Sequence, residues 1–308
     1  MSSPPVGSCH GFDVRSQLTL RLARDAMGSS QWGELNIEQA TNDPVEPASA
    51  PVRAWVPTPE KPFSARLHRL QDGFGLWIEG LGVYRTLPAK ALVMVPSGVS
   101  APRWESRLWG LPTVMQFITA GDLSLHAAAV EVNGSALLLT GPGRFGKTTL
   151  AAAFLSASYR VLSEDLCRCR LESRPVVFPG PASLRMRHDA YARLGHLPDT
   201  RVVLRDRERV HLALEGRMRG DGQPLPIAAI VSLRVHDGPV RLQAMSKEEA
   251  MRDLWAMSLK LPTDEDWTRC FIGVSSVVRD VPVWRLTRPL SFAALPELVE
   301  RLVTTCCV

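Results

Sequence analysis

The stretch LLLTGPGRFGKTTL, residues 137–150, decides how this chain folds. It predicts an apolar strand, a loop of the pattern Gly-x-x-x-x-Gly-Lys-Thr and then an alanine-rich helix, the context in which that pattern binds phosphate. The glycines let the backbone turn tightly and present N–H groups to phosphate oxygens, and the positive N-terminal end of the helix faces the anion. Lys147 can reach the β- and γ-phosphates of a nucleotide, and the Thr148 hydroxyl can ligate Mg²⁺. The residues predicted to bind the nucleotide are Gly141, Gly143, Arg144, Phe145, Gly146, Lys147, Thr148 and Thr149.

Composition narrows the class of protein. The chain has 308 residues, enough for two domains or for one large domain with an extension, and its 45% hydrophobic and 22% charged residues are ordinary for a globular protein. The net charge of +5 is small and no run of Lys or Arg stands out, so we expect no nucleic-acid partner. Residues 1–7 lack the design of a signal peptide, and no apolar run approaches the length of a membrane span. We therefore expect a cytoplasmic protein without a membrane partner.

The first 118 residues differ in pattern from the rest. Residues 41–51 are rich in proline and predict a loop or linker. Short alternating stretches at residues 65–70 and 75–80 predict a small β-rich region, in which no chemical motif appears. We expect one helix at its end to pack onto the following domain through Trp104, Trp109 and Phe117.

A hairpin places a histidine beside the glycine-rich loop. The Asn-Gly dipeptide at residues 133–134 predicts a two-residue turn between strands at residues 125–132 and 135–140. Such a turn sets the register, and counting outward from it brings His126 opposite Gly141. A lone histidine in a strand is usually structural. This position, however, would let His126 orient a carboxylate or contact a phosphate.

Two carboxylates are predicted at the same edge of the sheet. The helix that begins at Lys147 is predicted to run to about Ser156, and the next strand, residues 159–163, ends in Glu164 and Asp165. A strand–helix–strand crossover is normally parallel, so this strand ends at the edge where the loop lies. A carboxylate there can hold Mg²⁺ or accept a proton from the attacking nucleophile, whereas the alternative is an acidic pair that caps a turn. The arginines that could stabilise the phosphate, or simply lie in solvent, are Arg185, Arg187, Arg201, Arg205, Arg207 and Arg209.

The pattern continues as strands and helices to the end of the chain. Residues 227–233 predict a buried strand. Ser246 and Glu249 form a capping box that opens a helix extending through Leu259. A final strand and helix are predicted at residues 281–286 and 293–303.

Four segments together resemble the catalytic domain of the HPr kinase/phosphorylase family, and more closely its diverged serine-kinase-like relatives in peptide-modification clusters, including lasso-peptide clusters. They are LHAAAV at residues 125–130, the loop at 141–148, VLSEDL at 161–166 and FPGP at 178–181. The resemblance covers roughly residues 119–308. It implies an α/β P-loop kinase domain related in fold to phosphoenolpyruvate carboxykinase, preceded by the smaller β-rich region 1–118. Relatives tend to have small residues where this chain has Arg144 and Phe145.

The resemblance implies an enzyme that uses ATP and Mg²⁺ to phosphorylate a serine hydroxyl. By motif match, Lys147 and Thr148 take the nucleotide and Mg²⁺ roles, and His126 lies near the catalytic carboxylate. The family usually has Asp-Asp where this chain has Glu164 and Asp165, which leaves open how base and metal roles divide between them. We assign the base to Asp165, which keeps the family residue type, and give Glu164 a catalytic or metal-binding role.

Three functional hypotheses follow. The first is an ATP-dependent kinase that phosphorylates the serine of a peptide or small protein, for example a ribosomally made precursor peptide. The second keeps the kinase and makes the acceptor a small-molecule alcohol, and the sequence does not choose between them. The third is a nucleotide-binding regulatory or scaffold protein with weak or no transfer, although the intact Lys147, Thr148 and Asp165 favour catalysis. A homo-oligomer is compatible with all three.

Overall fold

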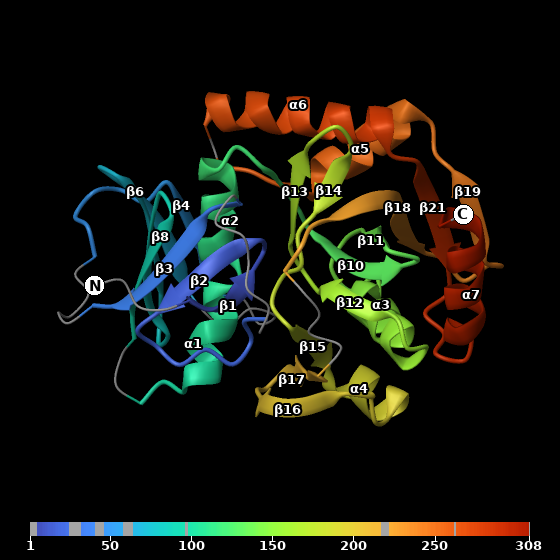
Figure 1. Ribbon diagram of the computed structural model, residues 1–308, viewed down its shortest axis with the longest axis horizontal. Coiled ribbons are helices and arrows are strands. Elements are labelled where there is room, and N and C mark those ends of the chain that lie inside the picture. Colours follow the sequence, from blue (N-terminus) through green and yellow to red (C-terminus); the bar gives the residue numbers. More distant parts are fainter. Residues whose placement is uncertain are drawn as a thin grey trace.

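Three β-sheets with helices around them make up the computed structural model, so the chain is a mixed α/β protein (Figure 1). The structure describes residues 5–24, 32–40, 46–57, 64–95, 98–216, 222–261 and 263–307. The first residues of the predicted loop at 41–51 lie outside these ranges, and its described part, residues 46–51, contains no helix or strand. Within the described ranges, no helix combines the length and the apolar character that a bilayer crossing needs.

An eight-stranded sheet forms the N-terminal part of the molecule, at the left of Figure 1. In spatial order its strands are β1 (Pro5–Cys9), β2 (Phe12–Ser16), β3 (Glu34–Gln39), β8 (Lys90–Met94), β7 (Gly82–Leu87), β6 (Gly73–Ile78), β5 (Ala65–Leu70) and β4 (Arg53–Trp55). The strands predicted at residues 65–70 and 75–80 correspond to β5 and β6. Alternate residues such as Leu35 and Ile37 on β3 point into a core beneath this sheet.

A ten-stranded sheet carries the glycine-rich loop. Its strands are β9 (Leu123–Leu125), β10 (Ala127–Val132), β11 (Ser135–Thr140), β12 (Arg160–Ser163), β13 (Cys167–Leu171), β14 (Pro175–Val177), β18 (Leu225–Val235), β19 (Arg241–Ala244), β20 (Ser258–Leu259) and β21 (Val283–Arg288). The helices packed on it are α3 (Lys147–Ser156), α5 (Lys247–Met257), α6 (Asp264–Asp280) and α7 (Leu295–Cys306). A small third sheet consists of β15 (Ser183–Arg187), β17 (Arg209–Leu214) and β16 (Thr200–Arg205), with α4 (His188–Leu194) beside it.

Helices cover both faces of the central strands, as Figure 1 shows for α6 on one side and α3 on the other. In β11, Leu137 and Leu139 pack in a core with α3 and α7, whereas Ala136 and Leu138 pack in a second core with α5 and α6. Successive side chains of a strand point to opposite faces, so an unbroken apolar run is what a strand covered on both sides requires.

The predicted hairpin register is confirmed as far as the ladder runs. Val132 pairs with Ser135, and the last pair at the open end is Ala127 with Thr140. The prediction of one unbroken strand over residues 125–132 is wrong, because the chain leaves the ladder at His126. The N–H of His126 donates instead to the carbonyl of Met257, and β9 pairs with β13 and β20 rather than with β11.

The predicted crossover is also confirmed. Both β11 and β12 run antiparallel to β10, which lies between them, so β11 and β12 are parallel to each other. The helix between them, α3, ends at Ser156 as predicted. Since parallel strands end at the same edge of a sheet, the residues after β12 lie on the side of the molecule that carries the loop.

Two helix predictions need correction. The capping box of Ser246 and Glu249 is present, but α5 ends at Met257 and Leu259 lies in β20, where pairing with β9 takes over the backbone hydrogen bonds. The single helix predicted near residues 104–117 is two helices, α1 (Ala101–Leu108) and α2 (Leu111–Thr119). They are separated at Gly110, which has non-helical φ and ψ of −99° and −128°. Trp104, Trp109 and Phe117 lie in the core beneath the N-terminal sheet, and residues of the following part pack into the same core, as predicted: Leu166, Ala213 and Leu261.

Two buried arginines connect the N-terminal part to the second sheet. Arg24 donates from Nε to the carbonyl of Gly180 at 2.7 Å and from Nη2 to the carbonyl of Leu162 at 2.5 Å. In the opposite direction, Arg168 on β13 donates to the carbonyl of His10 at 2.7 Å. A side chain of the N-terminal part, Arg24, therefore stabilises the end of β12.

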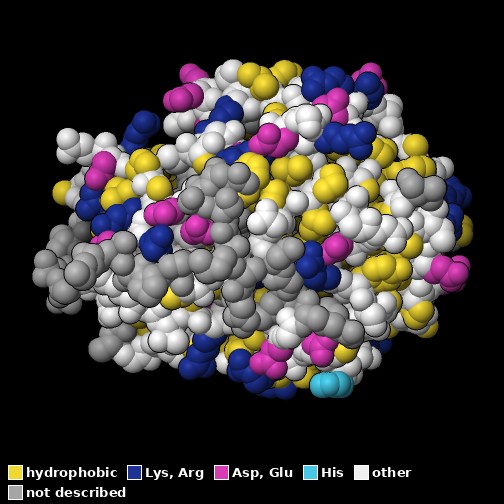
Figure 2. All heavy atoms as spheres, viewed as in Figure 1, with side chains coloured by type: hydrophobic (Ala, Val, Ile, Leu, Met, Phe, Trp, Pro, Cys, Tyr) yellow, Lys and Arg dark blue, Asp and Glu magenta, His cyan; other side chains and the backbone are white. Residues whose placement is uncertain are grey.

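Charged side chains of both signs are interspersed over the face drawn in Figure 2, among the residues shown in colour. Such mixing produces little long-range attraction for a polyanion on this face. Cys167 and Cys169 on β13 are wholly buried and pack as small apolar residues in the core beneath α5 and α6.

Candidate functional site

The glycine-rich loop, residues 141–146, connects β11 to α3 and depends on two glycines. Gly141 has a φ of +140°, and a side chain there would meet the carbonyl oxygen of Leu233 at 3.0 Å. Gly146 has a φ of +81° and forms the N-cap of α3. Both conformations are difficult for residues with a Cβ atom, so the two outer glycines of the motif are required by the backbone. Between them, Arg144 also has a positive φ, of 68°.

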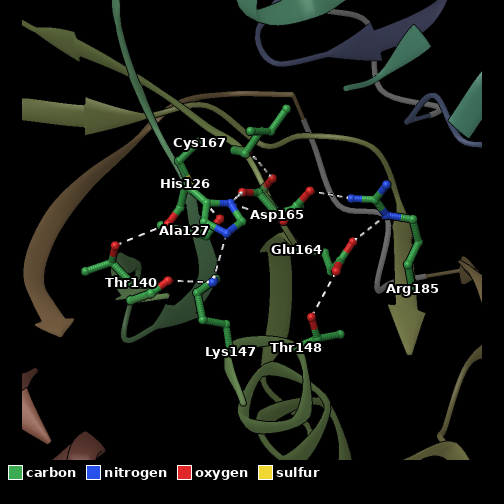
Figure 3. A network of polar contacts seen from close by, with 12 residues as sticks. His126, Ala127, Thr140, Lys147, Thr148, Glu164, Asp165, Cys167 and Arg185 are labelled. Atoms are coloured by element: carbon green, nitrogen blue, oxygen red, sulfur yellow. Dashed lines mark hydrogen bonds and ion pairs between the residues drawn. The ribbon is translucent and has the colours of Figure 1, made fainter. Parts of the chain in front are cut away.

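The ammonium group of Lys147 lies inside this loop. It donates to the carbonyl of Gly141 at 2.7 Å and to that of Pro142 at 3.2 Å, and it lies 3.0 Å from Nε2 of His126 (Figure 3). Burial lowers the pKa of Lys147, although the nearby Asp165 and Glu164 carboxylates oppose that shift. These contacts hold the ammonium group at the loop.

His126 bridges Lys147 and Asp165. Its Nδ1 lies 3.1 Å from the backbone carbonyl oxygen of Asp165 and 3.2 Å from the carboxylate oxygen Oδ1. An ammonium group can only donate, so Nε2 must accept from Lys147 and the ring proton must lie on Nδ1. Burial lowers the pKa of His126, with the positive charge of Lys147 adding to that shift and Asp165 opposing it. His126 is therefore a neutral imidazole that connects the loop cation to the carboxylate.

The two carboxylates after β12 point in different directions, as Figure 3 shows. Glu164 is buried and accepts from the Thr148 hydroxyl at 2.9 Å. Asp165 is partly exposed and faces His126. Arg185 on β15 joins them, because its Nε donates to Glu164 at 2.8 Å and its Nη2 to Asp165 at 2.6 Å.

The charge on Arg185 lowers the pKa of Asp165. Burial alone would raise the pKa of Asp165, but Arg185 and then His126 more than offset it, so that the pKa of Asp165 lies below its ordinary value. In return, Glu164 and Asp165 raise the pKa of Arg185. Asp165 is consequently an anion that can accept a hydrogen bond near neutral pH.

An open cleft of about 760 Å³ lies over the loop and the carboxylates. This volume is in the range of pockets that hold small molecules and cofactors. The predicted site residues that line it are Gly143, Arg144, Gly146, Lys147, Thr148, Thr149, His126, Glu164 and Asp165. Gly141 contributes its carbonyl to Lys147, and Phe145 packs partly buried against the core near α3.

Three of the six candidate arginines line the cleft and three lie outside it. Arg185, Arg187 and Arg209 line the cleft, and Arg209 donates to the carbonyl of Arg185 at 2.9 Å. Arg201 is paired with Glu215, and Arg205 lies over the ring of Tyr191. Arg207 is exposed on the turn between β16 and β17. Two further arginines line the cleft, Arg193 at the end of α4 and Arg288 at the end of β21, and sequence reasoning missed both because no motif surrounds them.

A small hollow meets the same carboxylates from the side of the N-terminal part. Its volume is about 20 Å³, room for a water or a hydroxyl group. Ser106 and Trp109 from the end of α1 line one wall, and Glu164, Asp165 and Arg185 line the other. Glu164, Asp165 and Arg185 are therefore shared by the cleft and the hollow.

No protein-family model matches the chain, and no curated protein matches its sequence. Among solved structures, the chain is similar to the HPr(Ser) kinase/phosphatase from Coxiella burnetii, with 13% sequence identity and a TM-score of 0.31. The match covers 59% of this chain and 93% of that one. This is a distant structural relationship, so the chemistry of the site is interpreted from its own residues.

Proposed function

We propose that this protein is an ATP-dependent kinase that transfers the γ-phosphate to a hydroxyl group, and that its acceptor is a serine of a peptide or small protein. The observation that carries the proposal is the network of Lys147, His126, Asp165, Glu164 and Arg185 at the mouth of a Gly-x-x-x-x-Gly-Lys-Thr loop. It brings a cation for phosphate, an ionised carboxylate and an arginine to one open cleft. These are the parts that phosphoryl transfer uses for positioning and charge stabilisation.

Each side chain has a role that follows from its contacts. Lys147 would exchange the carbonyls of Gly141 and Pro142 for phosphate oxygens. Asp165 would accept the proton of the acceptor hydroxyl. The hydroxyl oxygen would then bond to the γ-phosphorus while the bond between the γ-phosphorus and the β-phosphate oxygen breaks, leaving ADP. His126 touches both Asp165 and Lys147, so it would position the base relative to the phosphate.

The donor set at Thr148 and Glu164 fits Mg²⁺. A hydroxyl and a carboxylate 2.9 Å apart offer hard oxygen ligands, and Mg²⁺ in nucleotide sites takes only one or two protein ligands besides water and phosphate oxygens. Across the described ranges, no cluster of three or more His, Cys, Asp or Glu side chains suggests a separate metal site. Bound there, Mg²⁺ would neutralise charge on the β- and γ-phosphates.

The large cleft and the small hollow share three wall residues, which favours an acceptor that approaches from the side of α1. The glycine-rich loop lines only the large cleft, whereas Glu164, Asp165 and Arg185 line both the cleft and the small hollow beside Ser106. A hydroxyl in that hollow would face Asp165 from the side opposite the nucleotide. The N-terminal part would then contribute to the choice of acceptor.

One experiment distinguishes the proposed function from two alternatives. A small-molecule alcohol would use the same donor side, and a regulatory nucleotide-binding protein would bind ATP without transfer. We would titrate Mg²⁺·ATP into the wild-type chain and supply labelled ATP together with the peptides and alcohols implied by its own gene neighbourhood. Labelling of a peptide serine supports the proposal, and labelling only of an alcohol favours the second acceptor class.

Lys147→Ala tests the loop itself. We expect it to lose most nucleotide affinity or all transfer, because it removes the ammonium group at the loop. Lys247→Ala, an exposed residue at the start of α5, is the matched control. Equal binding and equal turnover in Lys147→Ala and wild type would overturn the loop assignment, and binding without transfer to any acceptor would favour the scaffold.

A further inference from the structure

Arg288 is a buried arginine without an anion. It is the last residue of β21 and only 2% of its surface is exposed. Its contacts are weak, since Nη1 lies 3.3 Å from the carbonyl of Pro289 and Nη2 lies 3.5 Å from that of Phe145. Its Nε has no hydrogen-bond partner, and no carboxylate of the described chain pairs with it.

The other buried arginines show what is missing. Arg24 is wholly buried and donates to three backbone carbonyls, and Arg168 is wholly buried and pairs with Asp122 at 2.6 Å. Burying a guanidinium is costly unless it is hydrogen-bonded or paired, so buried charges normally have partners. Arg288 is the exception among the buried arginines of the described residues, and its surroundings are suited to an anion that arrives from the cleft.

Arg288 lies directly against the glycine-rich loop. A Cβ built on Gly146 would be 2.7 Å from its Nη2 and 3.5 Å from a methyl group of Leu290. The residues that follow, Leu290 and Phe292, line the same cleft. Leu290 is 54% exposed, and Phe292 is a partly buried ring beneath the guanidinium of Arg193 at 5.3 Å.

Sheet order determines which end of a nucleotide would meet Arg288. The loop follows β11, the carboxylates follow β12 two strands away on one side, and Arg288 ends β21 two strands away on the other. A nucleotide whose γ-phosphate points to Asp165 must extend its α-phosphate and nucleoside toward β21. Leu290 and Phe292 then provide apolar surface where a base can stack or pack.

We propose that Arg288 binds the α-phosphate of the nucleotide and that Leu290 and Phe292 form the apolar surface that binds its base. The proposal rests on the proposed function only in requiring that the loop bind a nucleotide. In this proposal Arg288 contacts the nucleotide directly. The alternative is a structural role, in which Arg288 only holds Phe145 in place.

The test uses Arg288→Met in the full chain, with Arg288→Lys as the conservative variant. Arg241→Met, on the exposed neighbouring strand β19, removes the same charge outside the cleft. The probes are ATP, AMP and pyrophosphate, each titrated by calorimetry. We expect Arg288→Met to weaken ATP and AMP by ~10- to 100-fold, the scale of a lost charge-assisted hydrogen bond, and to change pyrophosphate less than about threefold. Arg288→Lys should recover part of the loss, and Arg241→Met should match wild type.

Thermal melting without ligand separates binding from support. Replacing an unpaired buried charge by an apolar side chain of similar length should leave the melting temperature equal or higher. A lower melting temperature together with equal weakening of all three probes would assign Arg288 to support and overturn the proposal. Unchanged ATP affinity in Arg288→Met would also overturn it while leaving the proposed function intact. A wild-type chain that binds none of the probes would overturn both.

Discussion

The hydroxyl of Thr148 donates a hydrogen bond of 2.9 Å to Oε1 of Glu164. This contact joins the first turn of α3 to the residue that follows β12, two places that are 16 positions apart in the chain. It also separates the tasks of the acidic pair, because Glu164 faces the loop helix and Asp165 faces His126. In the proposed kinase, this arrangement would assign the metal to Glu164 and the base to Asp165.

Glu164→Gln should raise the Mg²⁺ concentration needed for half-maximal ATP binding by ~10-fold or more, because the amide keeps the shape and loses the charge that attracts the cation. The measurement is a Mg²⁺ titration at fixed ATP. Glu172→Gln, in an exposed turn, is the control. An unchanged Mg²⁺ requirement would remove Glu164 from the metal site.

Asp165→Asn should leave ATP binding nearly unchanged and lower phosphoryl transfer by ~100-fold or more, the usual scale of a lost general base. The amide can still face His126 but cannot take a proton. Single-turnover transfer and ATP titration, measured on the same preparation, separate the two effects. Asp237→Asn, on an exposed bend, should transfer at the wild-type rate. Full transfer by Asp165→Asn would mean that another group is the base.

Transfer should decline in acid as His126 becomes protonated. Its pKa lies below the ordinary value of 6.5, so the neutral ring that accepts from Lys147 is populated above that lowered pKa and lost below it. Protonation would replace the 3.0 Å contact between Lys147 and Nε2 by repulsion between two cations. The prediction is a flat rate above about pH 6.5 and an acid limb below it. In His126→Asn the limb should shift or vanish and the plateau rate should fall, whereas an unaltered profile would exclude this role.

His10 should make the folded state sensitive to acid. Burial, then Arg168 and Arg24, lower its pKa from 6.5 to about 3. Between these values the unfolded chain binds a proton that the folded chain does not, so the free energy of unfolding falls as pH decreases, by up to ~1.4 kcal/mol per pH unit. His10→Asn removes this proton and tolerates the positive φ of 52° at that position.

Urea unfolding at several values between about pH 6.5 and about pH 4.5 measures the effect. The wild-type chain should lose more stability over that range than His10→Asn. The exposed His236→Asn should follow the wild type. Parallel curves for wild type and His10→Asn would show that His10 is not held neutral by the fold.

Local signals in the sequence predicted much of the site. The Asn-Gly turn fixed the hairpin register, and the crossover rule placed Glu164 and Asp165 on the edge that carries the loop. Both depend on backbone geometry within about 40 residues, which short-range turn and handedness rules describe well.

Long-range competition accounts for what was missed. The strand breaks at His126 because β9 pairs with β20, more than 130 positions later in the chain. No sequence pattern near His126 predicts this pairing. Arg288 is separated from Phe145 by 143 positions, and its unusual feature is a missing partner, which a sequence cannot display. The break at Gly110 could have been found, since a glycine followed closely by Pro112 is a boundary signal.

Two of the carbonyls that accept from Arg24, those of Val161 and Leu162, belong to β12, the strand that precedes the acidic pair, and the third is that of Gly180. Removing the first 118 residues would leave these carbonyls without their donors and would expose the side of β12 that Arg24 now covers. We therefore expect a fragment beginning at residue 119 to fold less stably than the full chain. Loss of the N-terminal sheet and unfolding of the edge that carries Glu164 and Asp165 should occur as one cooperative event, so proteolysis within either part would destabilise the other.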